Sequence, residues 1–140
     1  MAEKGCKLVR TTATFDGKQG FTYQAGISSA TAGAEGICLH MLTIPAGSRG
    51  RAHKHEHHET AIYLLSGEVH TWWGEQLEER MISRSGDFIF IPPGVPHLPV
   101  NFGPEPAVCL IARTDPNEQE SVVLLPELEA RVPASLDTAA

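Results

Sequence analysis

The chain has 140 residues, of which 41% are hydrophobic, and its 17 acidic and 11 basic side chains give a net charge of −6. This length fits one domain with a core of its own. Because no cluster of Lys and Arg offsets the negative charge, we expect no nucleic-acid partner and no binding to an anionic membrane. No stretch approaches the roughly 20 apolar residues of a membrane span, and the first residues lack the apolar segment of a secretory signal.

Short apolar segments separated by Gly and Pro follow one another along the chain, as expected for strands. In order they are 37–44, 61–65, 68–73, 87–91, 107–112 and 122–125. Their spacing predicts an antiparallel all-β sandwich or barrel rather than alternating strands and helices. Residues 25–36 are expected to form a connection, 126–132 one or two helical turns, and 133–140 a flexible tail. The sequence therefore predicts a single all-β domain with its barrel core at about 37–125.

The alternation of side chains along a strand assigns faces to several aromatic residues. Phe88 and Phe90 share a face, and we expect them to fill the barrel. Trp72 and Trp73 are adjacent, so only one of them can point inward.

The three cysteines, Cys6, Cys38 and Cys109, are widely spaced and form no CxxC pair. Such an odd, scattered set is typical of free thiols in a reducing compartment. We therefore expect a cytoplasmic protein.

Four of the seven histidines lie within the segment HKHEHHE, residues 53–59. On a strand, His53 and His55 would face the same side and could share one metal ion. Continuing this alternation brings His57 and Glu59 to that side as well. Imidazole with carboxylate suits a divalent transition metal (Fe, Mn, Zn, Ni, Co or Cu) without choosing among them. The alternative is a solvated histidine-rich loop.

A second pattern, GDFIFIPPGVPHLPVN, covers residues 86–101. Its Pro-Pro-Gly follows an apolar strand and makes a rigid turn, and His97 lies just beyond the turn on the returning strand. Taken alone, a single histidine in this position is more often structural than a ligand.

Together the two segments resemble the paired motifs of the cupin superfamily, in the right order and at a short separation. The first motif, G(X)5HXH(X)3–4E(X)6G, is similar to Gly47, His53, His55, Glu59 and Gly67. The second motif, G(X)5PXG(X)2H(X)3N, matches Gly86, Pro92, Gly94, His97 and Asn101 at every position. The chain thus resembles a small, single-domain bacterial cupin, with motifs at 47–67 and 86–101.

This resemblance implies a double-stranded β-helix (a jelly-roll barrel) with one metal ion inside it, bound by His53, His55 and His97. It also implies a small-molecule ligand in the barrel and a homodimer. The function expected is that of a metal-dependent enzyme with dioxygenase- or isomerase-type chemistry on an unknown substrate. The alternative is a non-enzymatic cupin that binds or senses a small ligand.

One departure from the first motif leaves the remaining ligand open. Glu59 lies eight residues before Gly67 where the motif has seven, and counting back from Gly67 gives Thr60, a poor metal ligand. Two phases of the following strand are therefore consistent with the sequence. One turns Glu59, Ala61, Tyr63 and Leu65 inward, and the other turns His58, Thr60, Ile62 and Leu64 inward. Glu59 is the first candidate for a further ligand and His58 the second, and the site could also lack one.

Overall fold

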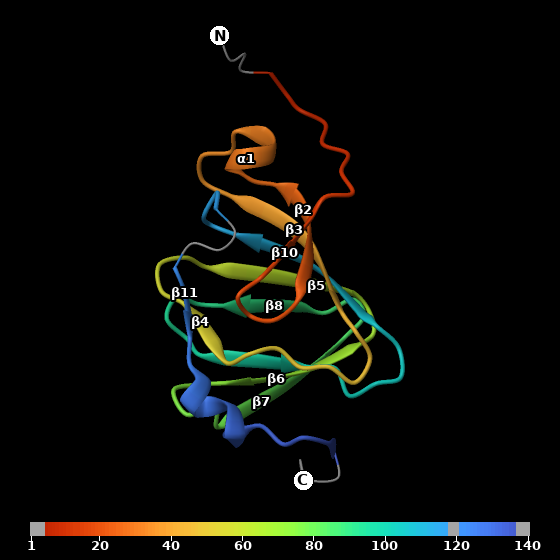
Figure 1. The fold of residues 1–140 in the computed structure, drawn as a ribbon, viewed down its shortest axis with the longest axis vertical. Helices are drawn as coiled ribbons and strands as arrows, with labels where there is room; N and C mark the ends of the chain where they lie inside the picture. The colour runs from red at the N-terminus through yellow and green to blue at the C-terminus, as the bar shows by residue number, and fades with distance from the viewer. Residues whose placement is uncertain (1–4, 118–120, 137–140) are drawn as a thin grey trace.

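The computed structural model describes residues 5–117 and 121–136 and shows two antiparallel β-sheets that face each other (Figure 1). One sheet has the order β1-β2-β3-β10-β5-β8. Its strands are β1 (Thr14–Asp16), β2 (Thr22–Ile27), β3 (Cys38–Ile44), β5 (Thr60–Ser66), β8 (Phe88–Ile91) and β10 (Ala107–Arg113). The other sheet has the order β11-β4-β9-β6-β7. Its strands are β4 (His53–His55), β6 (Glu68–Trp73), β7 (Glu79–Arg84), β9 (His97–Val100) and β11 (Val122–Leu124).

The all-β fold expected from the sequence is confirmed, and all six apolar segments form strands with ends shifted by at most one residue. Among the described strands, none of one sheet pairs with a strand of the other, so the hydrogen bonding does not close into a continuous barrel. The expected connection over 25–36 is only partly correct, because β2 extends into it to Ile27 and pairs with β3.

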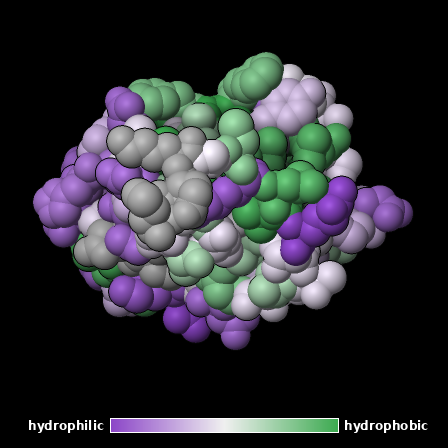
Figure 2. All heavy atoms as spheres, turned by 90° about the horizontal axis from the view of Figure 1, so that it is seen from above, coloured by the Kyte–Doolittle hydropathy of each residue, from purple (hydrophilic) through white to green (hydrophobic). Residues whose placement is uncertain are grey.

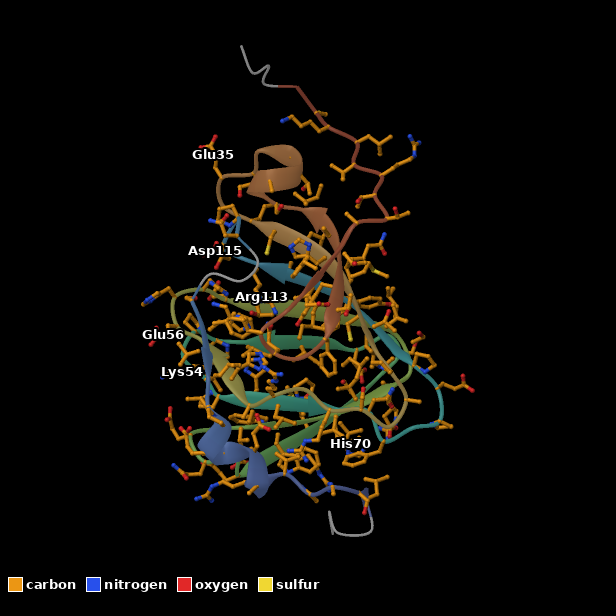
Figure 3. All side chains as sticks on the ribbon, in the orientation of Figure 1. Glu35, Lys54, Glu56, His70, Arg113 and Asp115 are labelled. Atoms are coloured by element: carbon orange, nitrogen blue, oxygen red, sulfur yellow. The ribbon has the colours of Figure 1, made fainter. Side chains whose placement is uncertain are left out.

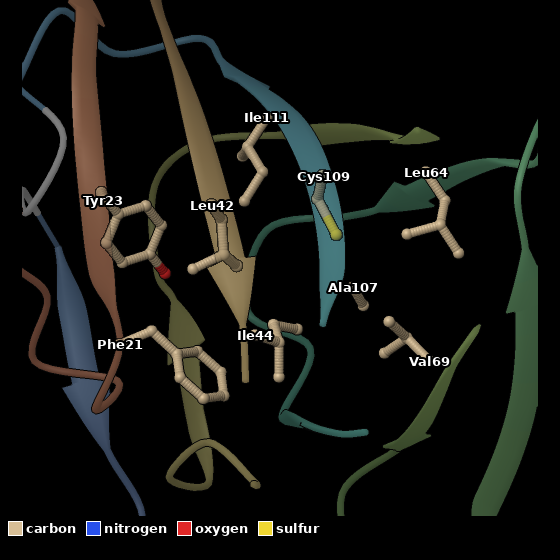
Figure 4. Packing of buried hydrophobic residues seen from close by; sticks show 9 residues of the cluster. All are labelled: Phe21, Tyr23, Leu42, Ile44, Leu64, Val69, Ala107, Cys109 and Ile111. Atoms are coloured by element: carbon tan, nitrogen blue, oxygen red, sulfur yellow. The ribbon is translucent and has the colours of Figure 1, made fainter. Parts of the chain in front are cut away.

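The main core fills the space between the two sheets (Figure 4). Alternate residues of β10, namely Ala107, Cys109 and Ile111, are buried there, whereas the residues between them are more exposed. Burial raises the pKa of the Cys109 thiol to about 11. Cys38 is buried as well, and none of the three cysteines forms a disulfide bond. The strand alternation that places apolar side chains inward thus forms the interior that surrounds the site.

A second core lies under the C-terminal segment, against the second sheet. Residues Pro126–Arg131 form a 3-10 helix, η1, which confirms the helical turns expected there. Leu128 of η1 packs in one cluster with Trp72 and Leu98. Trp72 is therefore buried under η1, whereas Trp73 remains 38% exposed. The Arg49 guanidinium donates hydrogen bonds to the carbonyl oxygens of residues 129, 132 and 133, which holds this segment in place.

Little else in the described chain is helical, because α1 comprises only Ser29–Ala32. Neither α1 nor η1 has the length and apolar character of a membrane-crossing helix, and the described residues contain no other helix. The expected tail over 133–140 is described only as far as Leu136, so residues 137–140 lie outside the described part.

The expectation that Phe88 and Phe90 fill the barrel is wrong. Their exposed fractions are 82% and 59%, and both lie on the outer face of the first sheet. The reason is the register, because β8 turns Ile89 and Ile91 toward the interior instead. Exposed apolar side chains also gather on the end of the molecule seen from above (Figure 2).

The turn between β5 and β6 carries the chain from the first sheet to the second. Gly67 adopts a φ of +89° there, and a Cβ on this residue would lie 2.7 Å from the Cα of Ala107. Both the left-handed backbone and the close approach to β10 require glycine at this position. The last glycine of the first motif is thus explained by packing.

Candidate metal centre

The pairing of two short strands brings the first and second motifs together. His53 of β4 lies directly opposite His97 of β9, and their ring centroids are 4.2 Å apart. His55 follows two residues after His53 and therefore projects from the same face of β4. The amide of Gly94 donates a 2.7 Å hydrogen bond to the carbonyl oxygen of His55, which ties the Pro-Pro-Gly turn to β4.

The three imidazoles form a compact group that could hold a metal ion. His53, His55 and His97 each offer one ring nitrogen, and these three atoms lie within 4.8 Å of one another. All three side chains are buried, with exposed fractions of 5% or less. Among the described residues, no carboxylate or thiol completes this group.

Hydrogen bonds to the backbone fix the protonation of two of the rings. Nδ1 of His53 lies 2.7 Å from the carbonyl oxygen of Arg51, and Nδ1 of His97 lies 3.0 Å from that of Val95. Because a carbonyl oxygen only accepts, each Nδ1 must carry the proton. Each neutral ring therefore has its lone pair on Nε2, the arrangement found in metal-binding histidines.

His55 is held by a third histidine rather than by a carbonyl. Its Nδ1 lies 3.0 Å from Nε2 of His58, which is itself buried. Nδ1 of His58 lies 3.1 Å from the Ser121 hydroxyl and 3.5 Å from an Asp115 carboxylate oxygen. A carboxylate only accepts, so Asp115 favours the proton on Nδ1 of His58. His58 Nε2 then accepts from His55.

In this arrangement the lone pair of His55 also lies on Nε2. That atom is buried and has no hydrogen-bond partner among the described residues. All three histidines of the group thus have Nδ1 engaged and Nε2 available, so the donor set fits a divalent transition metal.

The surroundings keep these rings neutral. Burial lowers the pKa of His97 to about 4, and it lowers the pKa of His53 and of His55 far below the usual range. The positive charge of Arg113 lowers all three values further, and the neighbouring histidines add to the effect on His53 and His55. Metal binding requires neutral imidazole, so these shifts favour it near neutral pH.

A cavity of about 50 Å³ lies beside the group, inside the fold. Its walls are mainly apolar side chains of both sheets, and His53 and His97 reach it from one side. The polar side chains Gln19, Tyr23 and Arg113 line it as well. Arg113 is the last residue of β10 and lies in the middle of the molecule, and Asp115 follows shortly after it (Figure 3).

The structure decides between the two strand phases. Thr60 and Leu64 of β5 are buried, and Ile62 and Leu64 line the cavity, whereas Ala61 and Leu65 are exposed. The side chains that point inward are therefore those of the phase that contains His58 and Thr60.

This phase leaves Glu59 outside the group. Its side chain is exposed, and its backbone pairs with Thr114 through two hydrogen bonds. His57 is exposed too. His58 points inward but contacts His55 rather than joining the three-histidine group.

Asn101, the last residue of the second motif, has a structural role. Its side-chain amide donates to the carbonyl oxygens of Ile44 and Glu105, and its Oδ1 accepts from the amide of Gly103. These bonds join the end of β9 to β3.

The two charged residues nearest the histidines, Arg113 and Asp115, were not identified from the sequence. Arg113 continues the inward alternation of Ala107, Cys109 and Ile111, a pattern that could have marked it as a buried cation. Asp115 gave no comparable signal, because its approach to His58 depends on the folded chain.

Comparison with known proteins agrees with this arrangement. A family model described as a cupin domain matches residues 40–113, more than half of the chain, and this range includes the three histidines. The chain belongs to the cupin family. Its fold is accordingly the double-stranded β-helix that the two motifs implied.

Individual relatives cover a range of described activities. The uncharacterized protein MJ1618 of Methanocaldococcus jannaschii is 34% identical over 83 residues, or 59% of this chain and 63% of that protein. The polyketide cyclase RemF from Streptomyces resistomycificus superimposes with a TM-score of 0.70 at 23% identity, over 93% of this chain and 96% of RemF. Oxalate decarboxylase from Lactobacillus farciminis, in a formate complex, superimposes with a TM-score of 0.68 at 21% identity, over 86% of this chain and 36% of the decarboxylase chain.

The chain thus spans a little under two thirds of MJ1618 and about a third of the decarboxylase. At such identities the two solved structures indicate a shared fold and no more.

Proposed function

We propose that this cupin is a metal-dependent enzyme that acts on a small molecule, with one divalent transition metal bound by His53, His55 and His97. The observation that carries the proposal is the geometry of the three buried rings. Each keeps its Nδ1 in a hydrogen bond and leaves Nε2 available. One ring nitrogen of each histidine lies within 4.8 Å of those of the other two.

The ion would supply Lewis acidity toward a substrate oxygen, or a binding site for a chelating substrate and oxygen, as dioxygenase- or isomerase-type chemistry requires. The chain's own residues prepare the site for this use. The carbonyl oxygens of Arg51 and Val95 keep two rings in the required orientation. The apolar walls of the cavity exclude bulk water and strengthen electrostatic interactions inside it.

The other two candidate ligands receive different roles in this proposal. His58 orients His55 through their 3.0 Å contact and does not bind the ion. Glu59 has no role at the site in this proposal. It belongs to the outward-facing phase of the strand, and its side chain is exposed.

The names of the similar proteins support the proposal of an enzyme, but they do not indicate which reaction it catalyses. A polyketide cyclase and an oxalate decarboxylase share the fold, and their described chemistries differ. A binding or sensor protein remains the alternative function, and it would retain a ligand without turnover.

The first experiment is elemental analysis of untagged protein purified without chelators or nickel resin. We expect about one equivalent of a transition metal per chain, and its loss in the His53→Ala/His97→Ala double variant. The matched control is His57→Ala, which removes an exposed histidine of the same segment and should retain the metal. Stoichiometric metal in the double variant, or no metal in the wild type after reconstitution, would refute the proposed centre.

We also propose a cytoplasmic homodimer. Three cysteines without a disulfide bond fit a reducing compartment. The outer face of β5 and β8 carries exposed Phe88 and Phe90 next to Tyr63, an apolar surface suited to a second copy of the chain. Light scattering should give the mass of two chains for the wild type and a shift toward one chain for Phe88→Ser/Phe90→Ser. A monomeric wild type would refute the dimer.

A further inference from the structure

Arg113 is a buried cation inside the cavity that the metal centre borders. Its exposed fraction is 4%, and it lines the cavity together with Tyr23, His53 and His97. Directly opposite on β5 lies Thr60, which is 2% exposed. Cross-strand partners project from the same face of a sheet, so the guanidinium and the Thr60 hydroxyl share one side of the barrel interior.

The hydrogen-bonding capacity of this pair is largely unused by the described protein groups. Arg113 and the Tyr23 hydroxyl form one hydrogen bond. Nε and Nη1 of Arg113, however, are buried without a partner, and so is Oγ1 of Thr60. Among the described residues, no carboxylate forms an ion pair with Arg113. A buried guanidinium without a counter-charge is strongly unfavourable, so this arrangement calls for an anionic group.

The position of Arg113 relative to the histidines also favours an anionic group at this site. His53 and His97 line the same cavity as Arg113. A cation bound by these rings would be repelled by the guanidinium, and the described residues contribute no carboxylate to the group. An anion placed between Arg113 and the rings would offset both positive charges.

We propose that Arg113 and Thr60 bind the carboxylate of a small organic acid, which thereby lies next to the three-histidine centre as the substrate or a ligand. This inference rests on the proposed function, because it names the substrate class of that same site. The guanidinium donates charge-assisted N–H hydrogen bonds, which carboxylate oxygens accept. The Thr60 hydroxyl supplies a further donor.

The size of the cavity limits the acid. A volume of about 50 Å³ holds about four water molecules at roughly 10–15 Å³ each. The site therefore suits a short-chain carboxylic acid and excludes long or aromatic acids unless the walls move.

The test compares acetate with acetamide, which has nearly the same shape and no charge, by calorimetric titration of the protein loaded with its metal. We expect acetate to bind and acetamide to bind at least about tenfold more weakly, since charge-assisted hydrogen bonds dominate. Arg113→Gln should weaken acetate binding by about 10- to 100-fold. The matched control Arg84→Gln removes the same charge from an exposed side chain and should leave the affinity unchanged.

Two further variants keep the test decisive if Arg113→Gln does not fold. Thr60→Val conserves shape and removes only the hydroxyl, and we expect a several-fold loss of acetate affinity. Arg113→Lys keeps the charge but replaces the guanidinium donors with a single ammonium group, and we expect an intermediate loss of acetate affinity. Unchanged acetate affinity in the variants that fold would overturn the proposal. Binding of inorganic phosphate in preference to acetate would overturn the assignment of a carboxylate.

Metal content measured in the same samples separates this inference from the proposed function. If the wild type binds no metal, the metal centre fails, while Arg113-dependent acetate binding by the metal-free protein would still support the anion site. If metal is stoichiometric in every variant and acetate affinity does not depend on Arg113, the metal centre stands and the anion site fails.

Discussion

Acid should destabilise the metal-free protein through its buried neutral histidines. Burial lowers the pKa of His97 from the 6.5 of an unperturbed histidine to about 4. Between these two values the unfolded chain binds a proton at this position and the folded chain does not. Each pH unit in this window is worth about 1.4 kcal/mol, so His97 alone lowers the free energy of unfolding by about 3 kcal/mol from pH 6.5 to pH 4.

The sign of this effect is fixed by the direction of the shift. Because the folded-state pKa is depressed, the full stability is present above pH 6.5, and it is lost as the pH falls toward 4. His53 and His55 also have lowered pKa values, so they add to the loss of stability in acid. Since domains of this size are stable by about 5–15 kcal/mol, the expected change is easily measured.

The assay is urea denaturation of metal-free protein at half-unit steps from pH 7 to pH 4. His97→Asn removes the titrating ring, so the slope of unfolding free energy against pH should fall by about 1.4 kcal/mol per pH unit. His57→Asn, at an exposed position, should keep the wild-type slope. An identical slope for His97→Asn and the wild type would show that His97 is not buried in the neutral form, and would refute the reasoning.

Two further predictions concern residues outside the metal-binding group. His58→Phe removes the hydrogen bond to Nδ1 of His55. Metal affinity, measured by chelator competition, should fall by about 10- to 100-fold, as it does when such outer contacts are lost. Wild-type metal affinity in this variant would contradict the orienting role of His58. Gly67→Ala should cost about 1–3 kcal/mol of unfolding free energy in urea, because its φ is +89° and Ala107 lies too close. Gly36→Ala, which has open space around it, is the control and should change stability by less than about 0.5 kcal/mol, so equal effects would refute the packing argument.

The parts of the fold that the sequence predicts well are those governed by local pattern. Apolar segments bounded by Gly and Pro mark strands within one residue of their ends, since strand alternation and turn chemistry act over a few neighbours. The spacing of the motifs, together with their resemblance to the cupin family, likewise selected His53, His55 and His97. β2 was partly missed because its polar and small residues pair with β3 mainly through the backbone.

The errors and open alternatives arise where tertiary register decides which face of a strand is buried. Alternation places Phe88 and Phe90 on one face, but only the pairing of β8 with β5 shows that this face is the outer one. Likewise, the phase that buries Thr60 and exposes Glu59 could not be chosen by counting residues. Arg113 was missed because a cation at the end of an apolar strand is usually solvated, and its burial depends on the neighbouring β5.

The location of β11 at the edge of the second sheet has a consequence for the synthesis of the protein. β4 carries two of the three histidines and pairs on one side with β9 and on the other with β11. Ser121, immediately before β11, also contacts His58. The ribosome must therefore release the chain beyond residue 124 before β4 has both neighbours, although its histidines are made some 70 residues earlier. Until then the histidines of β4 belong to an incomplete sheet, so we expect metal loading to follow the emergence of β11 from the ribosome.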